Sequence, residues 1–353
     1  MFSTQENNRY NRHFVLPQIG IEGQSKLKNA KVLMIGAGGL GCPVLQYLTA
    51  AGVGHIGIVD KDTIDESNLQ RQVLYTTNDI GKVKVEVAKK ALSLQNPFVK
   101  VSAHDEFLTA DNALSIISQY DIVVDGTDNF NSRYLINDAC VLSNKPLVFG
   151  SIHKFEGQLS VFNYENGPTY RCLYPEAPSD IANCSEAGVL GVLPGIIGAL
   201  MANEAIKIIV GIGEIYSGKL FVINALDLQI QVLKFSKSIY SEVKQLTDYD
   251  LLCESSSVKE ISVVQLMEKI KNKEEFQLID LRESYEQEKR MLNADEIVFG
   301  EILQKHKKIN ATIPVILFCK KGNRSQIAIK NLQDEYHFKN LHNLTGGADA
   351  WEE

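Results

Sequence analysis

A glycine-rich segment near the N-terminus could bind a nucleotide. Gly36, Gly38 and Gly39 belong to the run GAGGLG, which follows an apolar stretch and opens a helical pattern. Glycines in such a turn let the backbone approach a phosphate, while the start of the helix supplies free N–H donors. Asp60 ends the next apolar stretch, where a carboxylate can accept from ribose hydroxyls. Alone, this Rossmann-type pattern favours a nicotinamide or flavin enzyme.

Charged residues beyond this segment favour nucleotidyl transfer instead. Arg71, Lys84 and Asp128 follow successive strands of an alternating strand–helix pattern, so they should gather at one edge of a parallel sheet. The two cations would neutralise the α- and β-phosphates of ATP, and the carboxylate would hold Mg²⁺. A dinucleotide-dependent oxidoreductase, the alternative from another class, has no need of this set.

A second reactive segment lies near the C-terminus. Cys319 ends the apolar run PVILF and is followed by KKGNRS and a helical pattern. Backbone N–H groups of such a loop, together with nearby lysine and arginine, favour the thiolate and could hold an anion. The alternative is a buried cysteine beside a solvated basic turn. The loop residues assigned to this site are Cys319, Gly322, Arg324 and Ser325.

The other cysteines differ in their surroundings. Cys184 lies in the polar segment NCSEAG, which favours an accessible thiol. Cys42 and Cys140 lie in apolar helical patterns, which predicts that both are core residues. No cysteine pair has metal-finger spacing, and the first residues lack the apolar core of a signal peptide. These features predict a reducing, cytoplasmic setting.

The elements that position these residues form two α/β units. Alternating strands and helices in the first half predict a parallel, doubly wound sheet with helices on both faces. Strands without helices between them then extend this sheet as antiparallel strands. The predicted strands are 30–35, 55–60, 99–104, 122–125, 147–149 and 156–162, with further strands in 219–235, and the helices are 43–51, 83–94 and 194–210.

A polar stretch separates the two units. The chain has 353 residues, which suits two domains. We predict a nucleotide-binding domain over 1–245, a linker over 246–257 and a smaller α/β domain over 258–353. The second unit begins with a helix at 263–271.

The composition argues against some classes of partner. Hydrophobic residues make up 44% of the chain and charged residues 22%, which is typical of a globular protein with a substantial core. The net charge of −7 argues against nucleic acid or an anionic membrane as the main partner. The longest apolar run, 189–201, is too short to span a bilayer and predicts a buried segment.

Residues 9–235 resemble the molybdopterin-synthase and thiamine-biosynthesis adenylyltransferases (MoeB/ThiF type), relatives of the ubiquitin-activating enzymes. The matching motifs are RYNRHF, GAGGLG, DKDTIDESNLQRQVLY, DIGKVKVEVA, DGTDNFNSR and EAGVLGVLPGIIGALMANEAIK. The resemblance implies a homodimer in which Arg12 reaches into the partner's site, with Asp128 on Mg²⁺. The implied ATP-binding residues are Gly36, Gly38, Gly39, Asp60, Ser67, Asn68, Arg71, Gln72, Lys84, Asp128 and Asn129.

The same resemblance implies the substrate and the reaction. The C-terminal Gly-Gly carboxylate of a small β-grasp sulfur-carrier protein would attack the α-phosphate of ATP, giving an acyl-adenylate and pyrophosphate. Cys184 matches a cysteine that attacks this adenylate or joins a disulfide-linked intermediate. The relatives carry two CxxC pairs that bind zinc, whereas this chain keeps only Cys172, with Thr169 in place of its partner. One thiolate cannot form a closed zinc site, so we predict none.

Residues 258–353 resemble a rhodanese domain through LIDLRE, CKKGNRS and GGADAW. In that family the loop cysteine carries a persulfide, and four residues between Cys319 and Arg324 suit sulfur rather than phosphate. Asp280 and Arg282 match residues that brace the fold. The stretch 285–294 departs from the family pattern.

Three functions follow from these resemblances. The first is adenylation followed by sulfur transfer from a Cys319 persulfide, which would give a thiocarboxylate on the carrier. The second is adenylation followed by a thioester at Cys184, with the second domain as a non-catalytic docking module. The third is a scaffold that has lost its chemistry, against which the retained phosphate-site residues argue.

Overall fold

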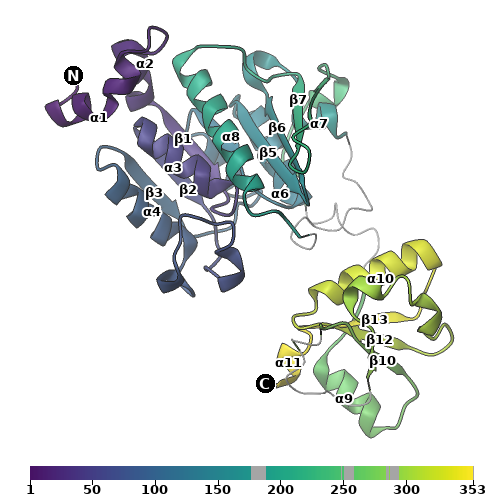
Figure 1. Cartoon of the computed structure of the whole chain (residues 1–353). Coiled ribbons are helices and arrows are strands. Elements are labelled where there is room, and N and C mark those ends of the chain that lie inside the picture. Colours follow the sequence, from purple (N-terminus) through teal and green to yellow (C-terminus); the bar gives the residue numbers. More distant parts are fainter. Residues whose placement is uncertain (176–187, 248, 250–257, 284–285, 287–293, 353) are drawn as a thin grey trace. The chain divides into compact units, whose positions relative to one another are not determined.

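The computed structural model describes residues 1–175, 188–247, 249, 258–283, 286 and 294–352 (Figure 1). Contacts divide the chain into two compact units, Met1–Cys253 and Glu254–Glu353. The segment 246–257, predicted as a linker, begins inside the first unit, because Leu246 and Tyr249 pack against its core.

The first unit contains one eight-stranded sheet with the order β3-β2-β1-β4-β5-β6-β7-β8. The first five strands in this order are parallel, and the last three continue the sheet as antiparallel strands. The predicted doubly wound sheet with an antiparallel extension is therefore confirmed. The strands are β1 (Lys31–Ile35), β2 (His55–Val59), β3 (Lys100–His104), β4 (Ile122–Asp125), β5 (Leu147–His153), β6 (Glu156–Phe162), β7 (Lys219–Asn224) and β8 (Ile230–Lys234).

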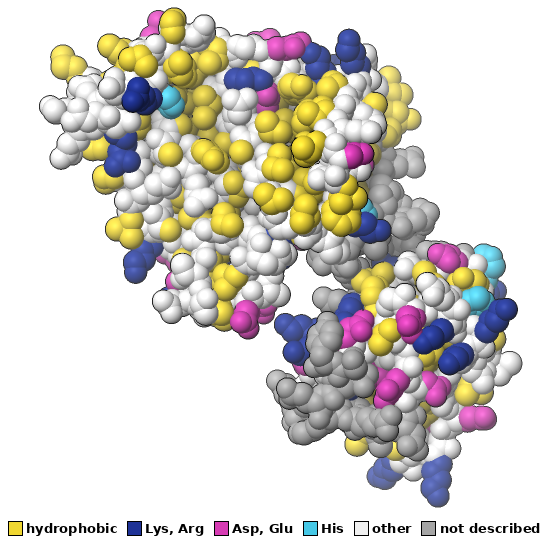
Figure 2. All heavy atoms as spheres, viewed as in Figure 1, with side chains coloured by type: hydrophobic (Ala, Val, Ile, Leu, Met, Phe, Trp, Pro, Cys, Tyr) yellow, Lys and Arg dark blue, Asp and Glu magenta, His cyan; other side chains and the backbone are white. Residues whose placement is uncertain are grey.

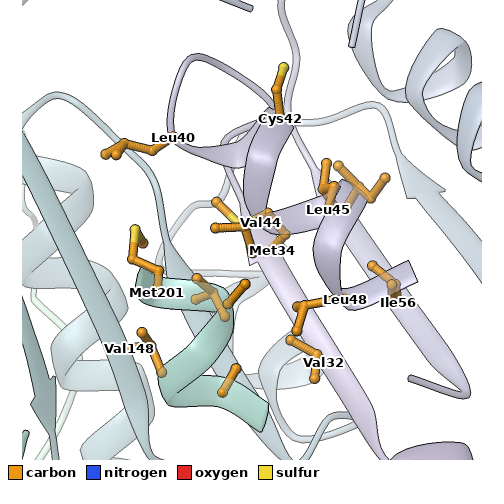
Figure 3. Packing of buried hydrophobic residues seen from close by; sticks show 14 of the residues in the cluster. Val32, Met34, Leu40, Cys42, Val44, Leu45, Leu48, Ile56, Val148 and Met201 are labelled. Carbon is orange, nitrogen blue, oxygen red and sulfur yellow. The ribbon is translucent and has the colours of Figure 1, made fainter. Parts of the chain in front are cut away.

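Helices cover both faces of this sheet. Side chains alternate along a strand, so Val32 and Met34 of β1 join one core cluster and Leu33 and Ile35 join the other. Side chains of α3 and α8 belong to the first cluster (Figure 3), as do side chains of α4, and side chains of α5 and α6 belong to the second. The helices are α1 (Thr4–Phe14), α2 (Gly20–Asn29), α3 (Gly41–Ala51), α4 (Lys84–Gln95), α5 (Ala113–Ile117), α6 (Phe130–Leu142), α7 (Tyr170–Leu173) and α8 (Leu193–Val210).

The apolar helix α8 agrees with the helix predicted over 194–210 and extends beyond the apolar run 189–201. Its 18 residues have a mean hydropathy of 1.6, so by length and composition alone it could cross a membrane. In the structure it packs on the sheet, and Ile197 and Met201 are fully buried. A Cβ atom added to Gly150 of β5 would lie 2.3 Å from the Met201 sulfur. We therefore describe α8 as a core helix.

The second unit is a five-stranded parallel sheet with the order β11-β10-β12-β13-β9. Val315 and Leu317 of β12 belong to one core cluster, and Ile316 and Phe318 to the cluster on the other face. The elements are β9 (Lys259–Ile261), α9 (Val263–Lys271), β10 (Gln277–Asp280), β11 (Asp295–Glu296), β12 (Val315–Phe318), α10 (Asn323–Tyr336), β13 (Leu341–Leu344) and α11 (Asp349–Glu352).

A buried carboxylate ties three segments of the first unit together. Asp138 of α6 accepts hydrogen bonds at 2.7 Å from both Nε and Nη2 of Arg171, and another at 2.7 Å from the Tyr249 hydroxyl. Asn137 donates to the same carboxylate at 2.9 Å. These bonds join α6 to α7 and to the last part of the unit, and they compensate for the burial of the charge.

We expect Tyr249→Phe to lower the free energy of unfolding of the first unit by about 1–2 kcal/mol, because a charged acceptor loses one buried donor. Urea unfolding followed by far-UV circular dichroism measures this change. The single tryptophan, Trp351, packs in the second unit and reports that unit separately. Tyr240→Phe is the matched control, since Tyr240 is exposed and its loss should change stability by less than about 0.5 kcal/mol. Equal effects of the two substitutions would contradict the role of Tyr249.

Candidate functional site

The glycine-rich turn depends on a close backbone approach. β1 ends at Ile35, and Gly36 follows with φ +90°, a conformation that favours glycine. A Cβ atom at Gly41 would lie 2.1 Å from the Gly36 carbonyl oxygen, so only glycine fits where α3 begins. Gly38 and Gly39 lie between these two points, with partly exposed backbone. The turn therefore presents main chain, rather than side chains, at the start of the helix.

Asp60 holds this turn in place through hydrogen bonds to backbone N–H groups. Its Oδ2 accepts a hydrogen bond from the Ala37 N–H at 2.7 Å, and its Oδ1 accepts from the Asp62 N–H at 2.8 Å. Tyr75 donates to the Ala37 carbonyl at 2.8 Å. Burial raises the pKa of Asp60, and Lys84 opposes this shift. Each carboxylate oxygen can accept more than one hydrogen bond, so Asp60 can still accept from a ribose while it holds the loop.

Lys84 is held by a partner that was not predicted from the sequence. Its side chain is only 6% exposed, and its Nζ lies 2.8 Å from Oδ2 of Asp62, which is 61% exposed. Asp62 stands in the run DKDTID, between Asp60 and the next turn, which was the available signal. The ion pair keeps a buried ammonium in place beside the carboxylate of Asp60. A phosphate could take over from the exposed carboxylate at low cost.

The turn around Glu66–Asn68 positions Arg71 and Gln72. Asp65 caps this turn: its carboxylate accepts from the Ser67 hydroxyl at 2.6 Å, and its N–H donates to the Asn68 side-chain oxygen at 3.2 Å. Arg71 donates to the Ser67 carbonyl at 3.0 Å.

Arg71 and Gln72 then flank the glycine turn. Cγ of Arg71 would lie 3.4 Å from a Cβ atom on Gly39, and Nε2 of Gln72 would lie 3.7 Å from one on Gly38. Gln72 is buried, and its side-chain oxygen has no hydrogen-bond partner among the described residues. The structure thus brings both predicted residues to the loop.

The segment after β4 completes this edge of the sheet. Asp125 is buried, and its Oδ1 accepts from the N–H and the hydroxyl of Thr127 at 2.8 and 2.7 Å. Burial raises the pKa of Asp125, an effect that Arg133 opposes. Asp128 is exposed, and Asn129 caps α6 by accepting from the Ser132 N–H at 2.9 Å. Asp125, whose carboxylate orders this turn, was not among the predicted site residues.

These residues fit ATP and Mg²⁺. Within the described part of the chain, the Asp125 Oδ2 is buried without a hydrogen-bond partner, so a carboxylate oxygen is available beside Asp128 for a hard cation or its water. A Cβ atom added to Gly36 would lie 3.0 Å from the Gly126 carbonyl oxygen, which places this turn against the glycine loop. Arg71 lies beside Gly39 of the same loop, and Lys84 is near Asp60, which holds the loop through Ala37.

Arg12 and the remaining cysteines of the sequence analysis have different surroundings, and Cys42 lies beside the glycine turn, with its sulfur 3.7 Å from the Ala37 carbonyl oxygen. Arg12 is exposed on α1, and the hydrogen bonds of the described residues do not connect it with the nucleotide loop. Cys184 lies outside the described residues. Cys42 and Cys140 are buried, which confirms them as core, and burial raises the pKa of Cys42 to about 12. Cys172 accepts hydrogen bonds from the N–H groups of Thr169 and Ser238, both at 3.4 Å.

The second unit holds Cys319 at the end of β12. Cys319 is 1% exposed, and its sulfur lies 3.7 Å from the Ser325 hydroxyl. That hydroxyl donates to the side-chain oxygen of Asn343 at 2.5 Å, and the amide nitrogen of Asn343 donates to the Glu260 carboxylate. Gly322 has φ +92° at the start of α10, as a tight loop onto a helix requires.

Two ion pairs surround this loop. Asp280 and Arg282 pair at 2.8 Å, and the guanidinium lies 5.5 Å from the centre of the Phe318 ring, which braces β10 against β12. Arg324 donates to both oxygens of Glu286 at 2.8 and 2.7 Å. Glu286 was not predicted from the sequence, because it lies 38 positions from Arg324 in a stretch without a motif.

Comparison with known proteins places both units. Residues 10–241 match the ThiF family, and residues 262–353 match the rhodanese-like domain. A Drosophila sechellia protein named adenylyltransferase and sulfurtransferase MOCS3 is 39% identical over 97% of this chain and 82% of its own length. The probable adenylyltransferase/sulfurtransferase MoeZ of Mycobacterium tuberculosis is 39% identical over 99% of this chain and 93% of its own.

Two further relatives match the first unit. A sulfur carrier protein adenylyltransferase of Thermus thermophilus is 48% identical over 71% of this chain and 98% of its own. Among solved structures, Escherichia coli MccB with ATP superposes with a TM-score of 0.59 and 28% identity, covering 67% of this chain and 73% of that one. On these matches, this chain belongs to the ThiF family and carries a rhodanese-like domain after its ThiF domain.

Proposed function

We propose that this chain uses ATP to adenylate the C-terminal Gly-Gly carboxylate of a small β-grasp sulfur-carrier protein and then transfers sulfur to it from Cys319. One arrangement supports the first activity: Arg71 lies beside Gly39 of the glycine turn, Lys84 is near Asp60, which holds that turn, and the segment just before Asp128 lies against Gly36. The relatives named for adenylyl and sulfur transfer, which match nearly the whole chain, support the pair of activities.

The residues of the first unit would act mainly by position and charge. The backbone of the glycine turn would bind the phosphates, and Asp60 the ribose. Arg71 and Lys84 would stabilise the charge that develops as the carrier carboxylate attacks the α-phosphate and pyrophosphate leaves. Mg²⁺ held by Asp128 would neutralise the phosphate oxygens. Lys84 must exchange Asp62 for a phosphate oxygen, and their ion pair keeps the ammonium ready for this exchange.

Sulfur transfer would follow on the adenylate. The terminal sulfur of a Cys319 persulfide attacks the acyl carbon, and AMP leaves, which gives an acyl disulfide. A second thiolate then attacks the Cys319 sulfur and releases the thiocarboxylate, leaving a disulfide. Cys184 is our candidate for this thiol. An activated carboxylate and a sulfur nucleophile in one chain raise each other's effective concentration.

We also propose that two copies of this chain form a homodimer and that the protein acts in the cytoplasm. Only half of the α8 residues are buried within one chain. Hydrophobic side chains gather over α8 on the face shown in Figure 2, and Val192 just before the helix is 61% exposed. A second copy could cover this surface. Arg12, which is exposed on α1, would then be free to reach the partner's ATP site.

We expect Lys84→Ala and Arg71→Ala each to lower the rate of ATP–pyrophosphate exchange by about 10²–10³-fold, because each removes a charge that acts in the transition state. Exchange is measured with a panel of small β-grasp proteins ending in Gly-Gly. Lys82→Ala is the matched control: Lys82 lies on the same segment but is 57% exposed, so its loss should leave exchange unchanged.

The same assay tests the class of reaction. Exchange with no member of the panel would contradict the proposed substrate. Binding of NAD or FAD without any exchange would favour an oxidoreductase instead.

We expect Cys319→Ser to abolish thiocarboxylate formation while ATP–pyrophosphate exchange stays at the wild-type rate, since the substitution removes the sulfur that carries the persulfide. Intact mass of the carrier measures the product, and exchange on the same sample is the control. Unchanged thiocarboxylate in Cys319→Ser would contradict the sulfur-transfer role. A carrier thioester that is lost in Cys184→Ser would then favour the thioester alternative.

A further inference from the structure

The loop after Cys319 is built to hold an anion. The carbonyls of Cys319 and Lys320 accept hydrogen bonds from the N–H groups of Ala348 and Asp349 at 2.8 and 2.9 Å. In a trans peptide the N–H points opposite to the carbonyl, so the next two N–H groups point away from residues 348–349. The 14-residue helix α10 begins directly after this loop and adds its N-terminal donors. The loop therefore concentrates positive potential at its centre.

Arg324 is the side chain placed to complete that anion site, but a carboxylate of the same chain already occupies it. Both ends of its guanidinium donate to Glu286, at 2.8 and 2.7 Å, in a two-bond arrangement. The hydrogen bonds to Glu286 are the largest cause that raises the pKa of Arg324, and Cys319 raises it to a smaller extent.

The Glu286 carboxylate is itself well held. Its Oε2 also accepts from the Glu283 N–H at 2.9 Å. The side chains of Arg324 and Glu286 are 28% and 16% exposed, so the pair is partly shielded from water. The hydrogen bonds from Arg324 lower the pKa of Glu286, which favours its charged form. A free oxyanion must displace this carboxylate, which is tethered close by and so acts at high effective concentration.

We propose that Glu286 is a specificity-determining residue of the Cys319 site, which excludes sulfur donors that carry an oxyanion by occupying Arg324. This inference rests on the proposed role of Cys319 as sulfur carrier. Glu286 would act in one step of that function, the loading of Cys319 with sulfur.

Two reactions could load Cys319 with sulfur, and only one of them requires a free Arg324 cation. From thiosulfate, the Cys319 thiolate attacks the outer sulfur, the sulfur–sulfur bond breaks, and sulfite leaves with the electron pair. The sulfonate group of thiosulfate needs the Arg324 guanidinium as its cation, and Glu286 competes for that guanidinium. From a thiol persulfide, the same thiolate attacks the terminal sulfur and the donor leaves as a thiolate, without any sulfonate. Glu286 therefore opposes the first reaction and leaves the second unaffected.

Steady-state kinetics of the full chain with thiosulfate as donor and cyanide as acceptor test this proposal. We expect Glu286→Gln to lower the KM for thiosulfate by about tenfold or more, because it frees a charged donor pair worth at least that factor. Sulfate should become a competitive inhibitor at correspondingly lower concentration. Loading of Cys319 from a small-molecule thiol persulfide, measured by intact mass, should stay the same.

Two further variants serve as controls for the loss of charge and for the role of Arg324. Glu283→Gln removes the same charge from the same segment without touching Arg324, and should leave the KM for thiosulfate unchanged. Glu286→Gln combined with Arg324→Gln should lose the gain, because the freed cation is absent. An unchanged KM in Glu286→Gln, with normal persulfide loading, would overturn the proposal. If Cys319 accepts sulfur from neither donor in the wild type, the proposed sulfur-transfer function fails instead.

Discussion

The close contact between Gly36 and Gly41 is the constraint on which the first unit depends. With a Cβ atom at Gly41 only 2.1 Å from the Gly36 oxygen, any side chain there would separate β1 from α3. That separation would move the start of α3 away from the turn that Asp60 and Tyr75 hold through Ala37. Arg71 and Gln72 approach the same turn from the outside. The glycine contact therefore sets where phosphate donors, cations and carboxylates can meet.

In both units the cation proposed to bind substrate forms an ion pair with a carboxylate of the same chain. Lys84 pairs with Asp62, and Arg324 pairs with Glu286. The two pairs differ in exposure: Asp62 is largely open to water, whereas Glu286 is mostly covered. An exposed carboxylate gives way cheaply to an incoming phosphate, and a covered one resists exchange. The same kind of ion pair can therefore prepare one site for its substrate and restrict the other.

Local sequence patterns predicted the helices and strands well. They did not predict the contacts between residues that are far apart in the sequence. The helix at 263–271 agrees with α9, because capping by Ser262 and apolar spacing are both local signals. β5 continues to His153 instead of ending at Phe149, because pairing with β6 extends it. Asp62, Glu286 and Tyr249 act through partners 22, 38 and 111 positions away. A charge or hydroxyl in a polar stretch gives no sign of such a partner, since an exposed residue has the same local sequence.

The anchoring of Tyr249 decides where the two units can be separated by protein engineering. A cut at the predicted boundary after residue 245 would remove Tyr249 and leave the Asp138 carboxylate with one donor fewer in a buried place. It would also remove Leu246, which packs on the same core cluster. A fragment ending after Cys253, where the contacts divide, keeps both residues. The shorter fragment would thus understate the stability of the nucleotide-binding unit, through the loss of a few residues that belong to its core.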